Sequence, residues 1–487
     1  MLLLINANRM QPPIAPVGID YVGDYARTAG IEVEFFDMTL VDRPVEALGE
    51  FLRDKSPALI GVSVRNVDDC FWPSGHSFVP EIEETIAAIR QASDAPIVLG
   101  GVGYSICADT LIGRLDATYG IRGDGEQATV ELYRALQHGQ SVEAVSGLLW
   151  QDAEGEIHAN RPAWPTELSV PSDRATVDNA TYFRLGGQVG IETKRGCPRQ
   201  CTYCADPIAK GNRSRLRTPH AIADEFESLL SQGVDVFHLC DAEFNLPYDH
   251  AIEVCRELSR RRLAERSRWY GYLAVIPFDA ELAREMARAG CVGINFTSDS
   301  AAPEMLRAYG HSHGADDLAR VVQLCRENQI AVMLDMLLGG PGETPLTLAT
   351  TIEAFRRIAP DCIGAGLGMR LYPGTAMSAD VLREDRLATA AGQPSGIRRH
   401  YSGPIDLSRP TFYISPQLGE RPARLVRELI GEDSRFFPPE EEILEGDPPP
   451  TAEQGDHNYN ANDALVQAIA GGARGAYWDI LRQLREG

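Results

Sequence analysis

Short apolar runs alternate with stretches of helical periodicity along the first 150 residues. The apolar runs predict β-strands and the periodic stretches predict helices, in alternation from Leu2–Asn6 to Glu126–Gln137. This alternation is typical of a parallel sheet with helices on both faces. We therefore predict a doubly wound, Rossmann-like α/β domain over residues 1–150, with its ligand beyond the carboxyl ends of the strands.

The same rhythm returns after residues 151–188, a polar stretch with scattered prolines that reads as a linker. Six strand–helix units, from Gln188–Thr193 to Ile363–Arg370, predict a partial (β/α)6 barrel of the TIM type over residues 189–376. Residues 377–487 have mixed patterns and are predicted to form a C-terminal domain that caps the barrel mouth and contributes to substrate selection. Within it Pro438–Gly455, acidic and rich in proline, is predicted to be mobile.

Three cysteines, Cys197, Cys201 and Cys204, form a C-x3-C-x2-C array in the loop after the first barrel strand. Thiolates this close together suit an iron–sulfur cluster or zinc. A structural zinc site normally takes four protein ligands, and no C-x-x-C or Cys/His pair nearby supplies a fourth. A [4Fe–4S] cluster held by three cysteines leaves one iron open to a small molecule. We predict such a cluster, with a zinc knuckle or unrelated core thiols as the alternatives.

This array, with the aromatic Tyr203 just before its last cysteine, resembles that of the radical S-adenosylmethionine (SAM) enzymes. The resemblance implies that the open iron chelates SAM and that electron transfer cleaves SAM to methionine and a 5′-deoxyadenosyl radical. An external one-electron reductant such as flavodoxin or ferredoxin is then the expected partner. The resemblance also implies SAM contacts from Tyr203, from Glu243 after the second barrel strand and from Asp299 after the fourth.

Three strand ends of the first domain are rich in glycine and small polar residues. Together with the cysteine array downstream, they resemble the cobalamin-binding domain of cobalamin-dependent radical SAM enzymes. The resemblance implies cobalamin contacts from three loops: Ser63, Arg65 and Asn66; Gly100, Gly101, Val102 and Gly103; Gly123, Gly125 and Glu126. Taken singly, each loop is equally typical of a plain turn, and Arg65 of a surface or ion-paired arginine. The glycine run is not a G-x-G-x-x-G fingerprint, since position 106 is Ile.

One motif of other cobalamin proteins is missing. The D-x-H-x-x-G motif, whose histidine ligates cobalt in many methyl-transferring cobalamin domains, is absent. The resemblance then implies that Arg65 and Asn66 lie under the lower corrin face, with no histidine on cobalt. Elsewhere, His311 and His313 stand two residues apart in a glycine-flanked loop with no third ligand, so we predict surface groups rather than a metal site.

Charge and composition exclude several classes of binding partner. With 46 Lys and Arg against 69 Asp and Glu, the net charge is −23, which argues against a nucleic-acid surface and an anionic membrane surface. No apolar run reaches transmembrane length, and the apolar start lacks a basic leader. Ten cysteines without secretory features fit a reducing compartment, so we expect a cytoplasmic protein that acts on a small molecule.

The resemblance implies a cobalamin-dependent radical SAM enzyme. We expect a methyltransferase that modifies an unactivated carbon of a small metabolite or natural-product intermediate; no catalytic residue can be assigned. In this chemistry the radical abstracts a hydrogen and methylcobalamin supplies the methyl group. Radical rearrangement, ring contraction or cyclisation with the same cofactors is the main alternative, and a non-catalytic cobalamin or cluster sensor is a second. The acidic balance disfavours a tRNA-modifying methylthiotransferase.

Overall fold

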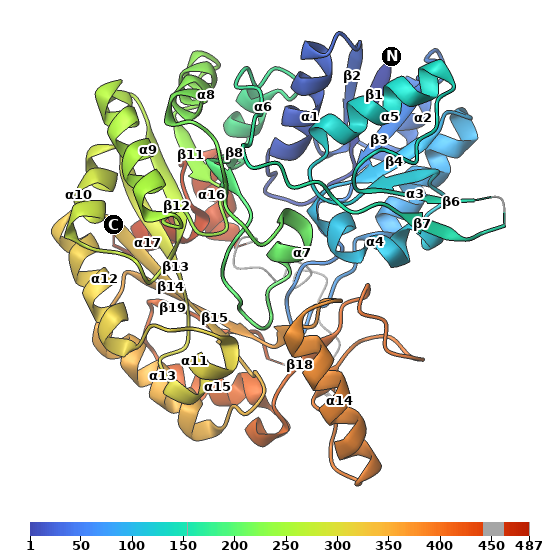
Figure 1. Cartoon of the computed structure of the whole chain (residues 1–487). Helices are drawn as coiled ribbons and strands as arrows, with labels where there is room; N and C mark the ends of the chain where they lie inside the picture. Colours follow the sequence, from blue (N-terminus) through green and yellow to red (C-terminus); the bar gives the residue numbers. More distant parts are fainter. Residues whose placement is uncertain (153, 442–461, 487) are drawn as a thin grey trace. The chain divides into compact units, whose positions relative to one another are not determined.

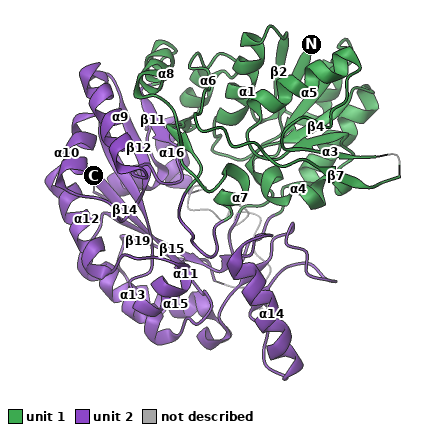
Figure 2. Ribbon diagram, in the orientation of Figure 1, with its two compact units in different colours: residues 1–69, 77–197, 205–234 green, residues 70–76, 198–204, 235–487 purple. Residues whose placement is uncertain are grey.

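The structure, a computed structural model, describes residues 1–152, 154–441 and 462–486 (Figure 1). The chain divides into two compact units (Figure 2). Unit 1 consists of residues 1–69, 77–197 and 205–234, and unit 2 of residues 70–76, 198–204 and 235–487. These units differ from the predicted domains, because the segment predicted as a linker folds into unit 1.

Unit 1 contains a sheet with the strand order β2-β1-β3-β4-β5-β6-β7. Its first five strands are parallel: β1 (Leu2–Asn6), β2 (Val33–Asp37), β3 (Leu59–Ser63), β4 (Ile97–Gly100) and β5 (Tyr119–Ile121). The order reverses beside β1, as in a doubly wound sheet, which confirms the predicted fold class. The hairpin of β6 (Leu148–Gln151) and β7 (Ile157–Ala159) continues the sheet in antiparallel fashion, which the sequence analysis did not foresee.

Helices cover this sheet in two groups. The helix pair α2 and α3 packs together, as does the pair α1 and α5; the bounds are α1 (Val17–Thr28), α2 (Pro44–Leu52), α3 (Val79–Ala92), α4 (Val102–Arg114) and α5 (Glu126–His138). Leu3 and Ile5 of β1 share one core with Leu48 of α2 and Ile86 of α3, since alternate strand residues point to the same face. The sequence pattern predicts a helix only over Asp109–Leu115, but helix α4 begins at Val102, because the glycine-rich turn at residues 100–101 leads directly into it.

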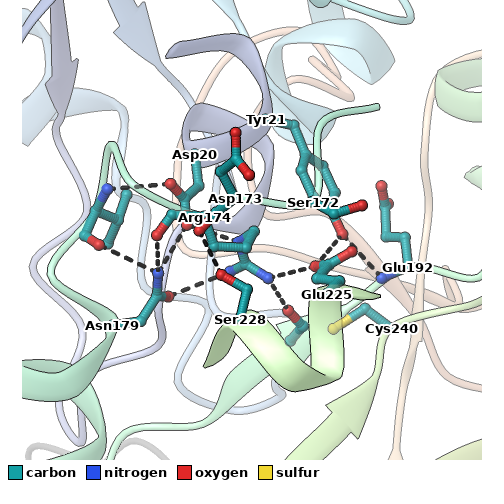
Figure 3. A network of polar contacts seen from close by, with 12 residues as sticks. Asp20, Tyr21, Ser172, Asp173, Arg174, Asn179, Glu192, Glu225, Ser228 and Cys240 are labelled. Carbon is teal, nitrogen blue, oxygen red and sulfur yellow. Dashed lines mark hydrogen bonds and ion pairs between the residues drawn. The ribbon is translucent and has the colours of Figure 1, made fainter. Parts of the chain in front are cut away.

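The remainder of unit 1 is held by a buried polar network around Arg174 (Figure 3). Its guanidinium contacts Asp20 Oδ2 and Glu225 Oε1, both at 2.6 Å, and all three side chains are 0 % exposed. Tyr21 donates to Glu225 Oε1 at 2.8 Å. The network joins α1, which carries Asp20, to α8 (Pro219–Ser231), which carries Glu225. The other later elements of unit 1 are α6 (Asn179–Arg184), β8 (Val189–Ile191), β9 (Lys194–Arg195), α7 (Asp206–Lys210) and β10 (Arg215–Leu216).

Unit 2 is built on parallel strands in the order β19-β15-β14-β13-β12-β11. Their bounds are β11 (Val236–Leu239), β12 (Arg268–Ala274), β13 (Cys291–Asp299), β14 (Ala331–Leu338), β15 (Cys362–Leu367) and β19 (Phe436–Phe437). The helices between them form an outer layer in Figure 1: α9 (Tyr248–Arg260), α10 (Ala280–Arg288), α11 (Pro303–Tyr309), α12 (Ala315–Glu327) and α13 (Pro345–Ile358). This is the predicted barrel-type architecture, with β19 as an unforeseen addition.

The faces of these strands can be told apart on β12. The indole N–H of Trp269 donates to Ala289 O just after α10, at 2.9 Å, so this side chain points toward the helices. Tyr270 and Tyr272 differ from it: Tyr270 donates to Asp479 Oδ2 at 2.8 Å, and Tyr272 is 42 % exposed. The inner face of the sheet is therefore the one that carries Tyr272.

Elements after residue 368 complete unit 2. They are β16 (Met369–Arg370), α14 (Ala376–Ala390), β17 (Ile397–Arg398), β18 (Phe412–Tyr413), α15 (Pro422–Ile430), α16 (Asp463–Ala470) and α17 (Tyr477–Glu486). Of these, β16, β18 and β17 form a small sheet of their own. Asp479 of α17 meets Tyr270, so the last helix packs against the sheet. The sequence pattern predicts one terminal helix over Ala464–Arg485, but Gly472, with φ +101°, separates α16 from α17. Most of Pro438–Gly455 lies outside the described residues. No described helix is long and apolar enough to cross a membrane.

Candidate functional site

A cavity of about 150 Å³ in unit 1 lies where β3, β4 and β5 end. Of the ten residues predicted to bind cobalamin, seven line it: Ser63, Gly100, Gly101, Val102, Gly123, Gly125 and Glu126. Gly101 has φ +100°, and a Cβ there would lie 2.6 Å from Val64 O. Glycine is therefore required at Gly101 both for the turn and for the close approach of two backbone segments.

The other three predicted residues lie elsewhere in unit 1. Arg65 and Asn66 line a smaller cavity of about 20 Å³, which shares Ser63 with the first. The Arg65 guanidinium lies 3.4 Å from Asn66 Oδ1. Gly103 packs helix α4 against this loop, since a Cβ on Gly103 would lie 2.9 Å from Asn66 Cα. Arg65 and Asn66 therefore line a small cavity that adjoins the one at Gly101 through Ser63.

The cavity at Gly101 also has a charged wall that the sequence analysis did not predict. Arg195 makes a bidentate contact with Glu126, at 2.7 and 3.0 Å, and its Nε donates to Glu192 Oε2 at 2.7 Å. Burial opposes ionisation of Glu192, but Arg195 and Lys210 outweigh it and lower the pKa of that carboxyl. The sequence feature that could have indicated Arg195 is its position two residues before Cys197.

The cysteine loop is anchored through its backbone. Cys197 is buried, and its amide donates to Gly211 O at 3.2 Å within unit 1. Cys201 and Cys204 are half-buried in unit 2 and joined by a turn, in which Cys204 N donates to Cys201 O at 3.2 Å. Among the residues that the structure describes, no three His, Cys, Asp or Glu side chains are gathered as metal ligands. The ligand set of the cluster therefore rests on the spacing of the cysteines.

Asp299 ends β13 in a left-handed conformation, with φ +56°. Its Oδ2 accepts a short hydrogen bond from the Tyr203 hydroxyl and lies 2.5 Å from His311 Nε2. Two of the three residues predicted to bind SAM therefore meet within unit 2. Burial and the charge of Asp299 raise the pKa of Tyr203 well above its usual value, so this phenol stays a donor.

The prediction that His311 and His313 are surface groups is wrong. The His311 side chain is only 5 % exposed, because it packs beside Asp299 and Tyr203. His313 is buried, and its Nε2 lies 3.0 Å from Ser298 O. Burial and the neighbouring His311 lower the pKa of His313 to about 4. The two histidines therefore support the end of β13.

Glu243, the third predicted SAM residue, follows β11 and is buried in the loop before α9. The loop is tied to the neighbouring strand, since Phe244 N donates to Tyr272 O at 2.8 Å and the Asn245 amide donates to Ala274 O at 2.8 Å. Glu243 is not among the described residues that line a cavity with Asp299. Its predicted contact with SAM stays a prediction.

A larger cavity, of about 650 Å³, lies within unit 2. Tyr272, Asn295, Asp335 and Gly364, one from each of four adjacent strands, contribute to its wall. Tyr203 and Asp299 line the same cavity, as do Cys70, Phe71 and Trp72 from the short N-terminal segment of unit 2. Unit 2 thus brings the predicted SAM residues Tyr203 and Asp299 to a cavity large enough for a small organic substrate.

Two family models match the chain. Residues 4–133 match the B12 binding domain, and residues 191–355 match the radical SAM superfamily. The chain is 31% identical, over 470 residues, to a tryptophan 2-C-methyltransferase from Streptomyces laurentii, covering 83% of this chain and 78% of that relative. The chain belongs to the cobalamin-dependent radical SAM family.

Solved structures agree with this assignment. The radical SAM methyltransferase TsrM from Kitasatospora setae, solved with tryptophan and the SAM analog aza-SAM, matches with a TM-score of 0.88 at 32% identity. The match covers 100% of this chain and 99% of that structure. A more distant relative, the anaerobic magnesium-protoporphyrin IX monomethyl ester cyclase of Rubrivivax gelatinosus, is 25% identical and covers 71% of this chain and 62% of its own.

The predicted family, fold class and general function are confirmed. The chain is a cobalamin-dependent radical SAM enzyme of the methyltransferase type, with a small-molecule substrate. The cofactors of such an enzyme are a [4Fe–4S] cluster, SAM and cobalamin, as its two domains require.

Proposed function

We propose that this enzyme transfers a methyl group to a carbon atom of tryptophan or of a closely related aromatic amine or amino acid. The observation that carries the proposal is the match to a tryptophan-bound methyltransferase over the whole chain. The cavity of unit 2 supports it, because an aromatic lining that includes Tyr272, Trp72 and Phe437 suits a planar ring.

The residues present fit the expected cofactors. Cys197, Cys201 and Cys204 would ligate the cluster, and Asp299, held by Tyr203 and His311, would accept hydrogen bonds from SAM. The glycine-rich cavity at Gly101 and Gly123, at the carboxyl ends of the strands of unit 1, would hold cobalamin. When bound, these groups supply the reductive cleavage of SAM and the transfer of the methyl group.

The protein itself orients SAM and encloses the substrate. Tyr203 and His311 hold Asp299 in one rotamer, so its free oxygen is fixed before a ligand arrives. Aromatic side chains of the cavity, Tyr272 and Trp72 among them, offer flat apolar surface to the substrate ring. An external reductant such as flavodoxin or ferredoxin would supply the electron, and the proposed compartment is the cytoplasm.

The test is turnover of the anaerobically reconstituted enzyme with SAM, tryptophan and a chemical reductant. We expect a singly methylated tryptophan, identified by mass spectrometry, whose methyl group carries the label of deuterated SAM. Consumption of an aromatic substrate without any gain of methyl would instead indicate a rearrangement or cyclisation. No turnover of any aromatic amine would contradict the proposed substrate class.

The cluster assignment has its own test. The triple variant Cys197→Ala, Cys201→Ala, Cys204→Ala is expected to lose iron, sulfide and the EPR signal of the reduced cluster. The matched control is Cys255→Ala, Cys291→Ala, Cys325→Ala, which removes three buried thiols of unit 2 outside the array. A triple array variant that keeps its cluster would refute the assignment.

A further inference from the structure

The inner wall of the barrel carries one carboxylate that the family resemblance did not assign. Asp335 lies in the middle of β14, on a strand that is otherwise apolar over residues 331–338. Its side chain lines the cavity of unit 2, and the residue is only part-buried because it opens onto that cavity. A carboxylate on an apolar wall requires a donor in the folded protein or in a ligand.

The protein positions this carboxylate from two sides. Asn295 Nδ2 on β13 donates to Asp335 Oδ2 at 2.7 Å. On β15, Gly364 leaves room for the other oxygen, since a Cβ at residue 364 would lie 2.2 Å from Asp335 Oδ1. Asp335 is therefore held in one place, with Oδ1 directed over a glycine.

Asn295 strengthens the acceptor character of this wall. It is 9 % exposed and lines the cavity, and its amide nitrogen is used by Asp335. Its carbonyl oxygen has no hydrogen-bond partner among the described residues. The pair thus offers acceptors, Asp335 Oδ1 and Asn295 Oδ1, where a ligand must supply the donors.

The charges around the cavity point to a cation. Its described lining includes the carboxylates of Asp299, Asp335 and Glu440, and contains no Lys, Arg or His. Asp299 already has two donors, from Tyr203 and His311, and Glu440 is solvent-exposed. Asp335 is the inner-wall carboxylate whose only described hydrogen bond comes from a neutral amide.

We infer that Asp335, positioned by Asn295 and Gly364, binds the ammonium group of the substrate, so that the enzyme selects aromatic compounds carrying a cationic amine. This inference rests on the proposed function and adds the residue that recognises the ammonium group of the substrate. An ammonium supplies the donors that the acceptor pair lacks, and its bond to the carboxylate is charge-assisted. Tyr272, opposite Asn295 in the strand register, offers a ring surface beside that point.

SAM also carries an ammonium group, so the two sources must be separated. Asp299 stands at the carboxyl end of β13, where this family is expected to hold SAM. Asp335 pairs with Gly364, well inside both strands, and lies farther from the strand ends. The position therefore assigns the substrate to Asp335 and leaves SAM to Asp299.

The test compares ligands that differ only in the amine. Binding of tryptamine and of 3-ethylindole, which lacks the amino group, is measured by equilibrium dialysis on the reconstituted holoenzyme with SAM present. We expect the wild-type enzyme to prefer tryptamine by about ten- to a hundredfold, the range of one charge-assisted bond. Asp335→Asn should lose that preference, bind 3-ethylindole normally and keep its affinity for SAM.

Two further variants make the result specific. Gly364→Ala, which leaves the carboxylate in place but crowds Oδ1, should also weaken tryptamine binding. Glu353→Gln, which removes an exposed carboxylate from α13, should change nothing.

Three outcomes would overturn the inference. The first is a wild-type enzyme that binds both indoles equally. The second is a loss of SAM affinity in Asp335→Asn. The third is a preference that disappears in Glu440→Gln instead. Because binding is measured directly, these outcomes are independent of whether tryptophan is methylated.

Discussion

Carboxylates of the two units differ in their surroundings: Asp20 and Glu225 are buried beside a cation, whereas Asp335 opens onto a cavity. In unit 1, Asp20 and Glu225 meet the guanidinium of Arg174 at 2.6 Å (Figure 3). Arg217 adds a second contact to Glu225. In unit 2, Asp335 receives one hydrogen bond from a neutral amide and faces a cavity. A buried acid with its counter-charge built in stabilises structure, whereas a fixed acid facing a cavity is prepared for a ligand.

The largest effect should come from breaking the paired network. Arg174→Met leaves Asp20 and Glu225 buried without their main cation, so the free energy of unfolding should fall by about 3–5 kcal/mol. Urea unfolding followed by circular dichroism measures it. Arg424→Met, at an exposed pair with Glu428, should stay within about 0.5 kcal/mol of wild type. Equal stability of the two variants would show that the buried ion pairs of Arg174 do not stabilise the fold.

Removing the cavity carboxylate should have the opposite sign. Burial raises the pKa of Asp335 to about 6, above the ordinary value near 3.8, so its charged form destabilises the fold. Asp335→Asn should therefore be at least as stable as wild type at pH 8. The difference should vanish in acid, since both folded and unfolded wild-type chains are protonated there. A loss of more than about 1 kcal/mol at pH 8 would make Asp335 a structural residue like Arg174.

The sequence predicted the strands well, because apolar runs of the right length mark them. β1 has the predicted bounds, Leu2–Asn6. The helix that follows Gly101 was placed too late, since its first turn is rich in glycine and small residues and shows no periodicity. The cysteine array could be found from its spacing after a barrel strand, whereas Asp299 was proposed from the family resemblance.

The interactions that the sequence did not predict are long-range. Arg174 and Asp20 are 154 residues apart, and nothing local shows that they meet. His311 looked exposed beside glycines, yet it is covered by Tyr203 and Asp299. The one sequence feature that marks Asp335 is that it is the single acidic residue in an apolar strand. Its meaning depends on Gly364 and on the cavity, which only the folded sheet reveals.

Ligand binding should report the same carboxylate through pH. Tryptamine remains cationic throughout the acid range, so its affinity should fall as the pH drops below about 6 and Asp335 becomes protonated. The groups that face Asp335 are Asn295 and Asp299 from β13, the latter with Tyr203 and His311, and the backbone of Gly364 from β15. Asp335→Asn should show no such dependence. An identical pH profile in that variant would assign the titration to another group.

The smallest effect concerns the partly compensated acid, Asp299. Tyr203→Phe removes one of its two donors and leaves His311 in place, so the affinity for SAM should fall by about five- to tenfold, or about 1 kcal/mol. Tyr248→Phe, which removes a similar hydrogen bond to Asp279 at an exposed site, is the control. Unchanged SAM affinity with weaker tryptamine binding would indicate that Asp299 binds the substrate rather than SAM.

The most direct test of the comparison is a crystal structure of the reconstituted holoenzyme with SAM and tryptophan. We expect the substrate ammonium within hydrogen-bond distance, about 3 Å, of Asp335 Oδ1, with the SAM ammonium or ribose near Asp299. Tryptophan bound with its ammonium away from Asp335, or SAM occupying that carboxylate, would contradict it.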